Sequence, residues 1–108
     1  MRKNVPQQAR NAFLTKMSGE SNYTVEYLEA VLKEDIPRLG TSVRRLIKKA
    51  IEERLIIDPV FFGKPLRYSL QGHRRLCVSD YRVVYRIEPE EQLIVIAAIE
   101  HRKDVYEG

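Results

Sequence analysis

The segment that most constrains the fold is an uninterrupted apolar run near the C-terminus, residues 93–99. A run of this length is enough for a strand but too short for a typical helix. A strand with apolar side chains on both faces has to be covered on both faces. Residues 93–99 therefore predict an internal strand of a small sheet, and the rest of the chain has to supply its cover.

Two segments before this run are also predicted as strands, residues 73–78 and 81–87, with turns at 79–80 and 88–91. Because side chains alternate along a strand, the first strand carries an apolar face and a face with reactive groups. Leu76 and Val78 share a face with Arg74, and the opposite face carries His73, Arg75 and Cys77. In the second strand one face carries Tyr81, Val83, Tyr85 and Ile87, and the other carries Arg82, Val84 and Arg86. Residues 23–27 alternate in the same way and predict a short first strand.

Two helices are predicted between the first strand and the others. Residues 28–39 place an apolar stripe on one helix face, consisting of Leu28, Val31, Leu32, Ile36 and Leu39. Residues 41–55 carry a second stripe, consisting of Val43, Leu46, Ile47, Ala50, Ile51 and Leu55. Pro37 disturbs the last turn of the first helix, Gly40 ends it, and Asp58-Pro59 ends the second. Residues 60–72 are predicted as a loop.

The element order is thus β-α-α-β-β-β. It predicts an α+β fold in which a helical hairpin packs on a small, mostly antiparallel twisted sheet. The chain has 108 residues, of which 44% are hydrophobic, which suits one domain spanning residues 23–108. Residues 1–22 hold four basic residues and no acid before Glu20, and are predicted as an N-terminal extension or arm.

No membrane span, metal or cofactor is expected. No apolar run reaches bilayer length, and the two histidines lie far apart without flanking acids. A single cysteine, Cys77, cannot form an internal disulfide, and this favours a reducing compartment, the cytoplasm. Cys77 itself is predicted to be a small packed residue rather than an activated thiol.

Basic residues are concentrated in one stretch whose only acid is Asp80. They are Lys64, Arg67, Arg74, Arg75, Arg82 and Arg86. If the strands on either side of Asp80 form a hairpin, Arg75 and Arg82 lie close together and repel each other unless an anion sits between them. Phosphate is the commonest ligand for such a patch. The alternative is that each arginine pairs with a nearby acid such as Glu100 or Asp104.

These residue types suit RNA cleavage without a metal. The 2′-hydroxyl attacks the adjacent phosphate, a base accepts its proton, cations hold the developing charge and an acid protonates the departing 5′-oxygen. Arginine matches phosphate oxygens and stays charged, so it suits the task of holding that charge. His73, His101 and Tyr106 are candidates for the proton-transfer steps.

The run GKPLRYSLQGHRRLCVSDYRVVYRI, followed by IAAIEHRKDVY, resembles the RelE/ParE superfamily of bacterial toxins, and in particular its RelE-like branch. The resemblance covers residues 23–108. It implies a toxin of a type II toxin–antitoxin system that enters the ribosomal A site and cleaves mRNA by the route above. The departures are Cys77, where many relatives have arginine, and Ser79, where glycine is usual.

Residue roles also follow from the resemblance. Arg75 is implied as a general acid or phosphate ligand, Arg82 and Arg102 as transition-state clamps, and Tyr106 as the group that orients or activates the 2′-hydroxyl. Further RNA contacts are expected from Lys64, Arg67, His73, Arg74, Arg86, His101 and Lys103.

The implied partners are mRNA, the ribosome and a RelB-like antitoxin, with operator DNA reached only through the toxin–antitoxin complex. Two alternatives stay open. One is a ParE-like toxin that inhibits DNA gyrase without cutting RNA. The other is a decayed toxin that only binds an antitoxin.

Overall fold

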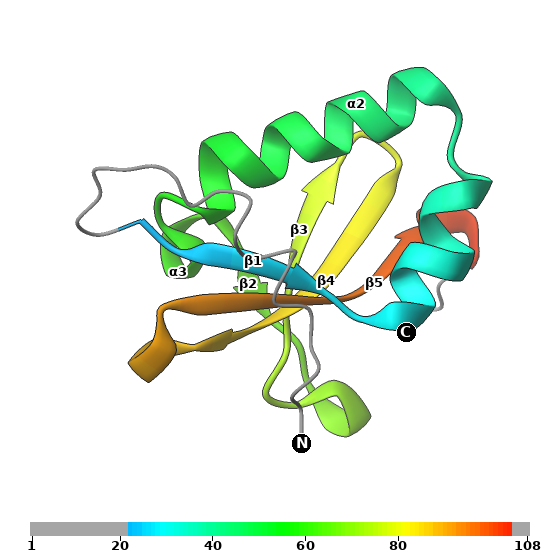
Figure 1. The fold of residues 1–108 in the computed structure, drawn as a ribbon. Coiled ribbons are helices and arrows are strands. Elements are labelled where there is room, and N and C mark those ends of the chain that lie inside the picture. Colours follow the sequence, from blue (N-terminus) through cyan, green and yellow to red (C-terminus); the bar gives the residue numbers. More distant parts are fainter. Residues whose placement is uncertain (1–21, 105–108) are drawn as a thin grey trace.

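One five-stranded sheet, in the order β1-β5-β4-β3-β2, organises the part of the chain that the structure describes (Figure 1). The structure is a computed structural model that describes residues 22–104, so residues 1–21 of the predicted arm and the predicted site residue Tyr106 lie outside it. The strands are β1 (Thr24–Tyr27), β2 (Lys64–Pro65), β3 (Arg74–Val78), β4 (Tyr81–Glu88) and β5 (Leu93–His101).

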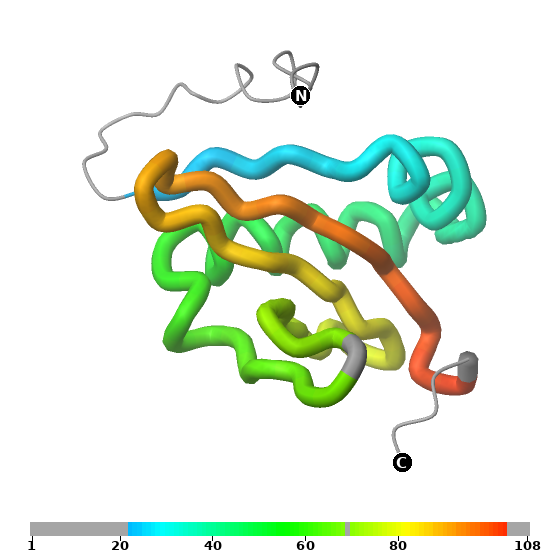
Figure 2. Tube along the Cα trace, turned by 90° about the horizontal axis from the view of Figure 1, so that it is seen from below, coloured from blue at the N-terminus to red at the C-terminus, as the bar shows by residue number. Residues whose placement is uncertain are grey.

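The apolar run forms β5, which lies between β1, a parallel neighbour, and β4, an antiparallel one. Its residues 93–96 are all buried although they alternate between the two faces of the sheet. The prediction of an internal strand is confirmed. Figure 2 shows β1, β5 and β4 as successive rows, with the long helix behind them.

That long helix consists of α2 (Thr41–Ala50) and its direct continuation η4 (Ile51–Leu55), and it crosses one face of the sheet (Figure 1). The core lies between this helix and the sheet. Its fully buried members include Val31, Ile51, Leu55, Val83, Tyr85, Ile94 and Ile96. The α+β fold class is therefore confirmed, and the face of β4 that carries Val83 and Tyr85 is the one turned toward the helix.

The first predicted helix spans residues 29–38, close to its predicted bounds, and Leu39 is extended. Most of it consists of η2 (Val31–Asp35) and η3 (Ile36–Arg38). Leu28 and Leu32, which were predicted to be buried, are 41% and 50% exposed. The predicted helix and its disturbed last turn at Pro37 are confirmed, but the predicted burial of Leu28 and Leu32 is wrong. Leu46 of α2, also in a predicted stripe, is likewise exposed.

A side-chain hydrogen bond fastens these short helices to the sheet. The Asp35 Oδ2 atom accepts the backbone N–H of Ile99 at 2.9 Å, close to the irregularity where β4 and β5 shift register. A β-bulge leaves backbone groups without their ladder partner, and a carboxylate can satisfy one of them.

The connection between the long helix and β3 is more ordered than the predicted loop. It contains α3 (Pro59–Phe62), β2 and η5 (Tyr68–Leu70). Asp58 caps α3 by accepting the N–H of Phe61 at 3.1 Å, and Pro59 supplies its first residue. Asp58-Pro59 thus ends one helix, as predicted, and begins another.

Two side chains from the sheet hold α3 in place. The buried Tyr85 hydroxyl donates to the Pro59 carbonyl at 2.6 Å, and Arg74 donates to the carbonyls of Val60 (2.9 Å) and Gly63 (3.1 Å). Burial raises the pKa of Tyr85, and the hydrogen bond with Arg74 opposes that shift. The position of α3 is therefore set by the core and not by local sequence alone.

Tyr27 at the end of β1 makes the stability of the fold sensitive to alkaline pH. Burial, and secondarily the Glu52 carboxylate, raise the pKa of Tyr27 to about 12. The folded state therefore holds this proton more tightly than the unfolded chain, whose tyrosines titrate near pH ~10. The contribution of this proton to the free energy of unfolding should be fully present below pH ~10. The free energy of unfolding should then fall by about 2 kcal/mol as the pH rises to about 12. Urea unfolding of the wild type and of Tyr27→Phe across this range measures the difference. Parallel pH profiles for the two proteins would contradict it.

Candidate functional site

An open pocket of about 450 Å³ lies at the edge of the sheet where β2 ends. It is lined by Arg54, Phe62, Lys64, Arg75, Leu76 and Cys77. β2 pairs only with Arg74 and Arg75, so on that side no strand among residues 22–104 covers the rest of β3. The pocket therefore collects side chains from η4, α3, β2 and β3.

All the charged side chains that line this pocket are positive. Lys64 lies directly opposite Arg75 in the β2–β3 pair, an arrangement of like charges that destabilises a sheet. Arg54 adds a third cation from the end of the long helix. Among the side chains that the structure describes, no carboxylate forms an ion pair with any of the three. An anion bound between them would relieve the repulsion.

Arg54 is a pocket residue that the sequence analysis did not single out. It follows Glu52 and Glu53 near the end of the long helix, in a stretch where alternating charges indicate a solvated face. Arg54 reaches the pocket only because the chain returns through α3 and β2 to the end of that helix. No local pattern in the sequence signals that return.

Cys77 was predicted to be a packed residue, and this prediction is wrong. The side chain is exposed and lines the pocket. Alternation along β3 buries Leu76 and Val78 on the helix side and turns Cys77 to the other side. The thiol therefore lies on the face of β3 that the long helix does not cover, and it faces solvent.

Arg82 is the partner of Cys77 across the β3–β4 pair and lies on the same sheet face as Arg75. The hairpin therefore brings Arg75 and Arg82 onto neighbouring strands, as the sequence predicted. However, Arg82 is 9% exposed, and its Nε and Nη2 atoms lie 3.2 and 3.1 Å from Glu100 Oε1. Arg82 therefore forms the ion pair with Glu100 that the sequence allowed as an alternative. The role of Arg82 as a transition-state clamp stays a prediction.

The residues after β5 lie beside the start of β4 and the β3–β4 turn, because His101 pairs with Tyr81 and Glu100 pairs with Arg82. The backbone N–H of Arg102 donates to the Asp80 carbonyl at 2.8 Å, and its guanidinium lies 4.0 Å from the Asp80 carboxylate, with both side chains exposed. His101 lies opposite Tyr81, with ring centroids 4.9 Å apart, and its Nδ1 accepts the N–H of Lys103. Tyr81 packs against the core, so His101 faces the helix side of the sheet, away from Arg75 and Arg82.

The other predicted RNA contacts differ in their surroundings. Arg74 is engaged with the carbonyls that hold α3, so the structure gives it a structural role and we leave it out of the proposed RNA surface. Arg86 pairs with Glu88 at 3.1 Å, and Arg67 is exposed. His73, which immediately precedes β3, has a buried Nδ1 with no hydrogen-bond partner in the described chain.

Neither a metal cluster nor a membrane-spanning helix is found between residues 22 and 104. No group of three or more His, Cys, Asp or Glu side chains in the described chain could hold a metal ion. No helix in the same range is long and apolar enough to cross a bilayer.

Comparison with known proteins places this sequence and this fold in a family of toxins. Residues 25–106 match the family described as the ParE toxin of the type II toxin–antitoxin system parDE. The chain belongs to the RelE/ParE superfamily of toxins.

Within this superfamily, the individual relatives of the chain are RelE-like toxins. Toxin RelG of Mycobacterium tuberculosis is 31% identical over 84 residues, which cover 78% of this chain and 95% of RelG. Toxin RelE of the same organism is 31% identical over 90 residues, covering 83% and 92%. The toxin–antitoxin complex RelBE2 from M. tuberculosis contains a chain with a TM-score of 0.70 and 30% identity, covering 75% of this chain and 99% of that one.

Proposed function

We propose that this toxin is an endoribonuclease that cleaves mRNA on the ribosome and that a RelB-like antitoxin holds it inactive. The observation that carries the proposal is the pocket in which Arg54, Lys64 and Arg75 meet without a carboxylate partner among the described side chains. Three cations around an open, exposed space are suited to a phosphodiester. Membership of a toxin superfamily with RelE-like relatives supports the same conclusion.

The proposed reaction uses the RNA's own 2′-hydroxyl as the nucleophile. The 2′-hydroxyl gives up its proton to a base while its oxygen attacks the adjacent phosphorus. The bond to the 5′-oxygen breaks and that oxygen takes up a proton from an acid, so that a 2′,3′-cyclic phosphate and a free 5′-hydroxyl result. Lys64 and Arg75 would bind the non-bridging oxygens, where negative charge grows in the transition state. Tyr106 would orient the 2′-hydroxyl, and Arg82 would contribute only after exchanging Glu100 for phosphate.

A second candidate function is inhibition of DNA gyrase without RNA cleavage. It is favoured by the description of the matching family, which is that of ParE toxins. A toxin that acts only by binding gyrase has no evident need for three cations gathered around one open pocket. For this reason the pocket favours the nuclease.

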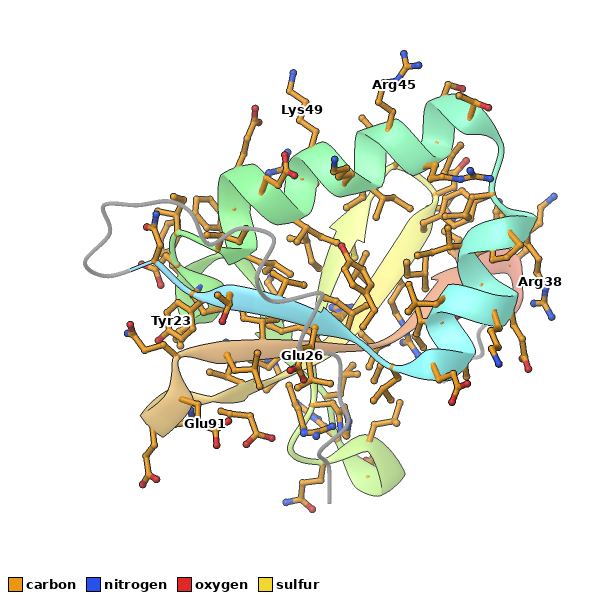
Figure 3. All side chains as sticks on the ribbon, viewed as in Figure 1. Tyr23, Glu26, Arg38, Arg45, Lys49 and Glu91 are labelled. Carbon is orange, nitrogen blue, oxygen red and sulfur yellow. The ribbon has the colours of Figure 1, made fainter. Side chains whose placement is uncertain are left out.

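Induction of the toxin without its antitoxin separates these candidates. We expect translation to stop and mRNA to be cut at positions in register with codons, as mapped by sequencing of 5′ ends. Arg75→Ala should weaken these effects. Arg45 projects from α2 away from the sheet, so Arg45→Ala removes one positive charge outside the pocket and is the matched control (Figure 3). Intact mRNA with altered plasmid supercoiling would instead establish the gyrase function, and growth without arrest would indicate a decayed toxin.

The antitoxin is proposed from the structural neighbours. Several of them are RelB–RelE complexes, from M. tuberculosis, Escherichia coli and Pyrococcus horikoshii. Those below 25% identity support the fold alone. Co-purification of this toxin with the product of a short adjacent gene would test the partnership directly.

A further inference from the structure

The one-turn helix α3 exposes two aromatic rings beside the cationic pocket. Phe61 is 74% exposed and Phe62 is 38% exposed, and their ring centroids lie 4.9 Å apart at an interplanar angle of 86°. A phenylalanine side chain left in water forgoes the favourable free energy that burial of its apolar area would give. Two such side chains on a helix that the core holds in place indicate a binding surface.

Phe62 connects this surface to the charge. It lines the same pocket as Arg54, Lys64 and Arg75. Proteins that bind single-stranded nucleic acid combine cations that follow the backbone with aromatic rings on which bases stack. The edge of the sheet therefore offers both components side by side.

The rings are also positioned before any ligand arrives. Asp58 caps α3, Tyr85 holds Pro59, and Arg74 holds Val60 and Gly63. A platform that is already ordered loses less conformational entropy on binding. With most of its surface in solvent, Phe61 keeps a ring face free for stacking.

We propose that Phe61 and Phe62 form a base-stacking platform for a nucleotide next to the phosphate held by Arg54, Lys64 and Arg75. The inference rests on the proposed function and adds to it a subsite that grips single-stranded RNA beside the scissile bond. The competing occupant is an apolar segment of a protein partner, because Ile57 and Val60 are exposed nearby. The three cations in the adjoining pocket favour RNA.

Binding of a short 2′-O-methyl oligonucleotide containing 2-aminopurine tests the platform. This probe has no free 2′-hydroxyl and cannot be cleaved, and the fluorescence of 2-aminopurine is quenched when it stacks. With the full-length toxin we expect quenching on binding. Phe61→Ala and Phe61→Leu should both weaken binding by about tenfold and reduce the quenching, because each removes one base–aromatic stack. Phe61→Trp should retain both.

The leucine variant is decisive because it keeps apolar area and removes the π face. Ile57→Ala is the matched control, since it removes exposed apolar area two residues before α3 without removing a ring. Wild-type affinity and quenching in Phe61→Leu, or an equal loss in Ile57→Ala, would overturn the platform in favour of protein docking. Absence of quenching with the wild type would also overturn it.

The outcome is separable from that of the proposed function. If quenching depends on Phe61 but the toxin cuts no mRNA, the platform is supported and the nuclease function is excluded. If the toxin cuts mRNA while Phe61→Ala and Phe61→Leu bind the probe normally, the nuclease function is supported and the platform is excluded.

Discussion

Replacing Arg75 by alanine is expected to lower the rate of mRNA cleavage by about 10²-fold or more, the size of effect expected when one donor to a transition-state charge is lost. Arg75 lines the pocket, lies opposite Lys64 and has no carboxylate partner among the side chains that the structure describes. Its charge is therefore available to phosphate. The measurement is the rate of cleavage of ribosome-bound mRNA by purified toxin.

Two variants separate the role of Arg75 from simple loss of charge. Arg75→Lys keeps the charge but not the forked geometry, so its rate should fall between those of the wild type and Arg75→Ala. Arg45→Ala removes one exposed charge elsewhere and should cleave at the wild-type rate. Removing Arg75 also relieves its repulsion with Lys64, so the Arg75→Ala protein should be at least as stable as the wild type. A full cleavage rate in the folded Arg75→Ala protein would remove this residue from the proposed mechanism.

Gly63→Ala is expected to destabilise the fold by about 3 kcal/mol, the cost of forcing extra volume into a packed site. A Cβ at residue 63 would collide with the hydroxyl of Tyr85 and lie 3.0 Å from the carbonyl oxygen of Arg75. Tyr85 is fully buried and its hydroxyl is bonded to Pro59, so it cannot move aside without breaking that bond. For a domain of this size the melting temperature should fall by about 15 °C.

Gly40→Ala is the matched control for this prediction. Gly40 precedes α2, and an added Cβ would meet nothing within 4 Å. Its stability should stay within about 1 kcal/mol of the wild type, because alanine restricts the unfolded chain more than glycine does but is a poorer N-cap residue for α2. Urea unfolding of both variants gives the comparison, and equal stabilities would show that Tyr85 yields more easily than the packing suggests.

Much of the fold follows from periodicity. The apolar run at residues 93–99, the alternation in β3 and β4, and the stripe of the long helix predicted the internal strand, the hairpin and the packed face. The same alternation predicted that Arg75 and Arg82 would lie on one face of neighbouring strands. These are local properties, because side-chain direction follows from backbone period.

The local pattern is insufficient where tertiary contacts decide the surroundings of a side chain. The apolar stripe of residues 28–39 predicted burial, but only part of it meets the core: Val31 and Leu39 are buried, whereas Leu28 and Leu32 are exposed. Arg74 lies in a basic stretch, yet it is engaged with the carbonyls of Val60 and Gly63. Hydrogen bonds over 14 or 11 residues leave no periodic trace in the sequence.

The sequence by itself determined the order of the elements, the faces of the strands and the superfamily, since each depends on residue type and spacing. Only the tertiary structure decided which cations share a pocket. Arg54, Phe62, Lys64 and Arg75 come from separate elements, and Tyr85 and Arg74 hold α3 where these side chains can meet. Such a meeting depends on how the chain packs in three dimensions, which spacing along the chain does not encode.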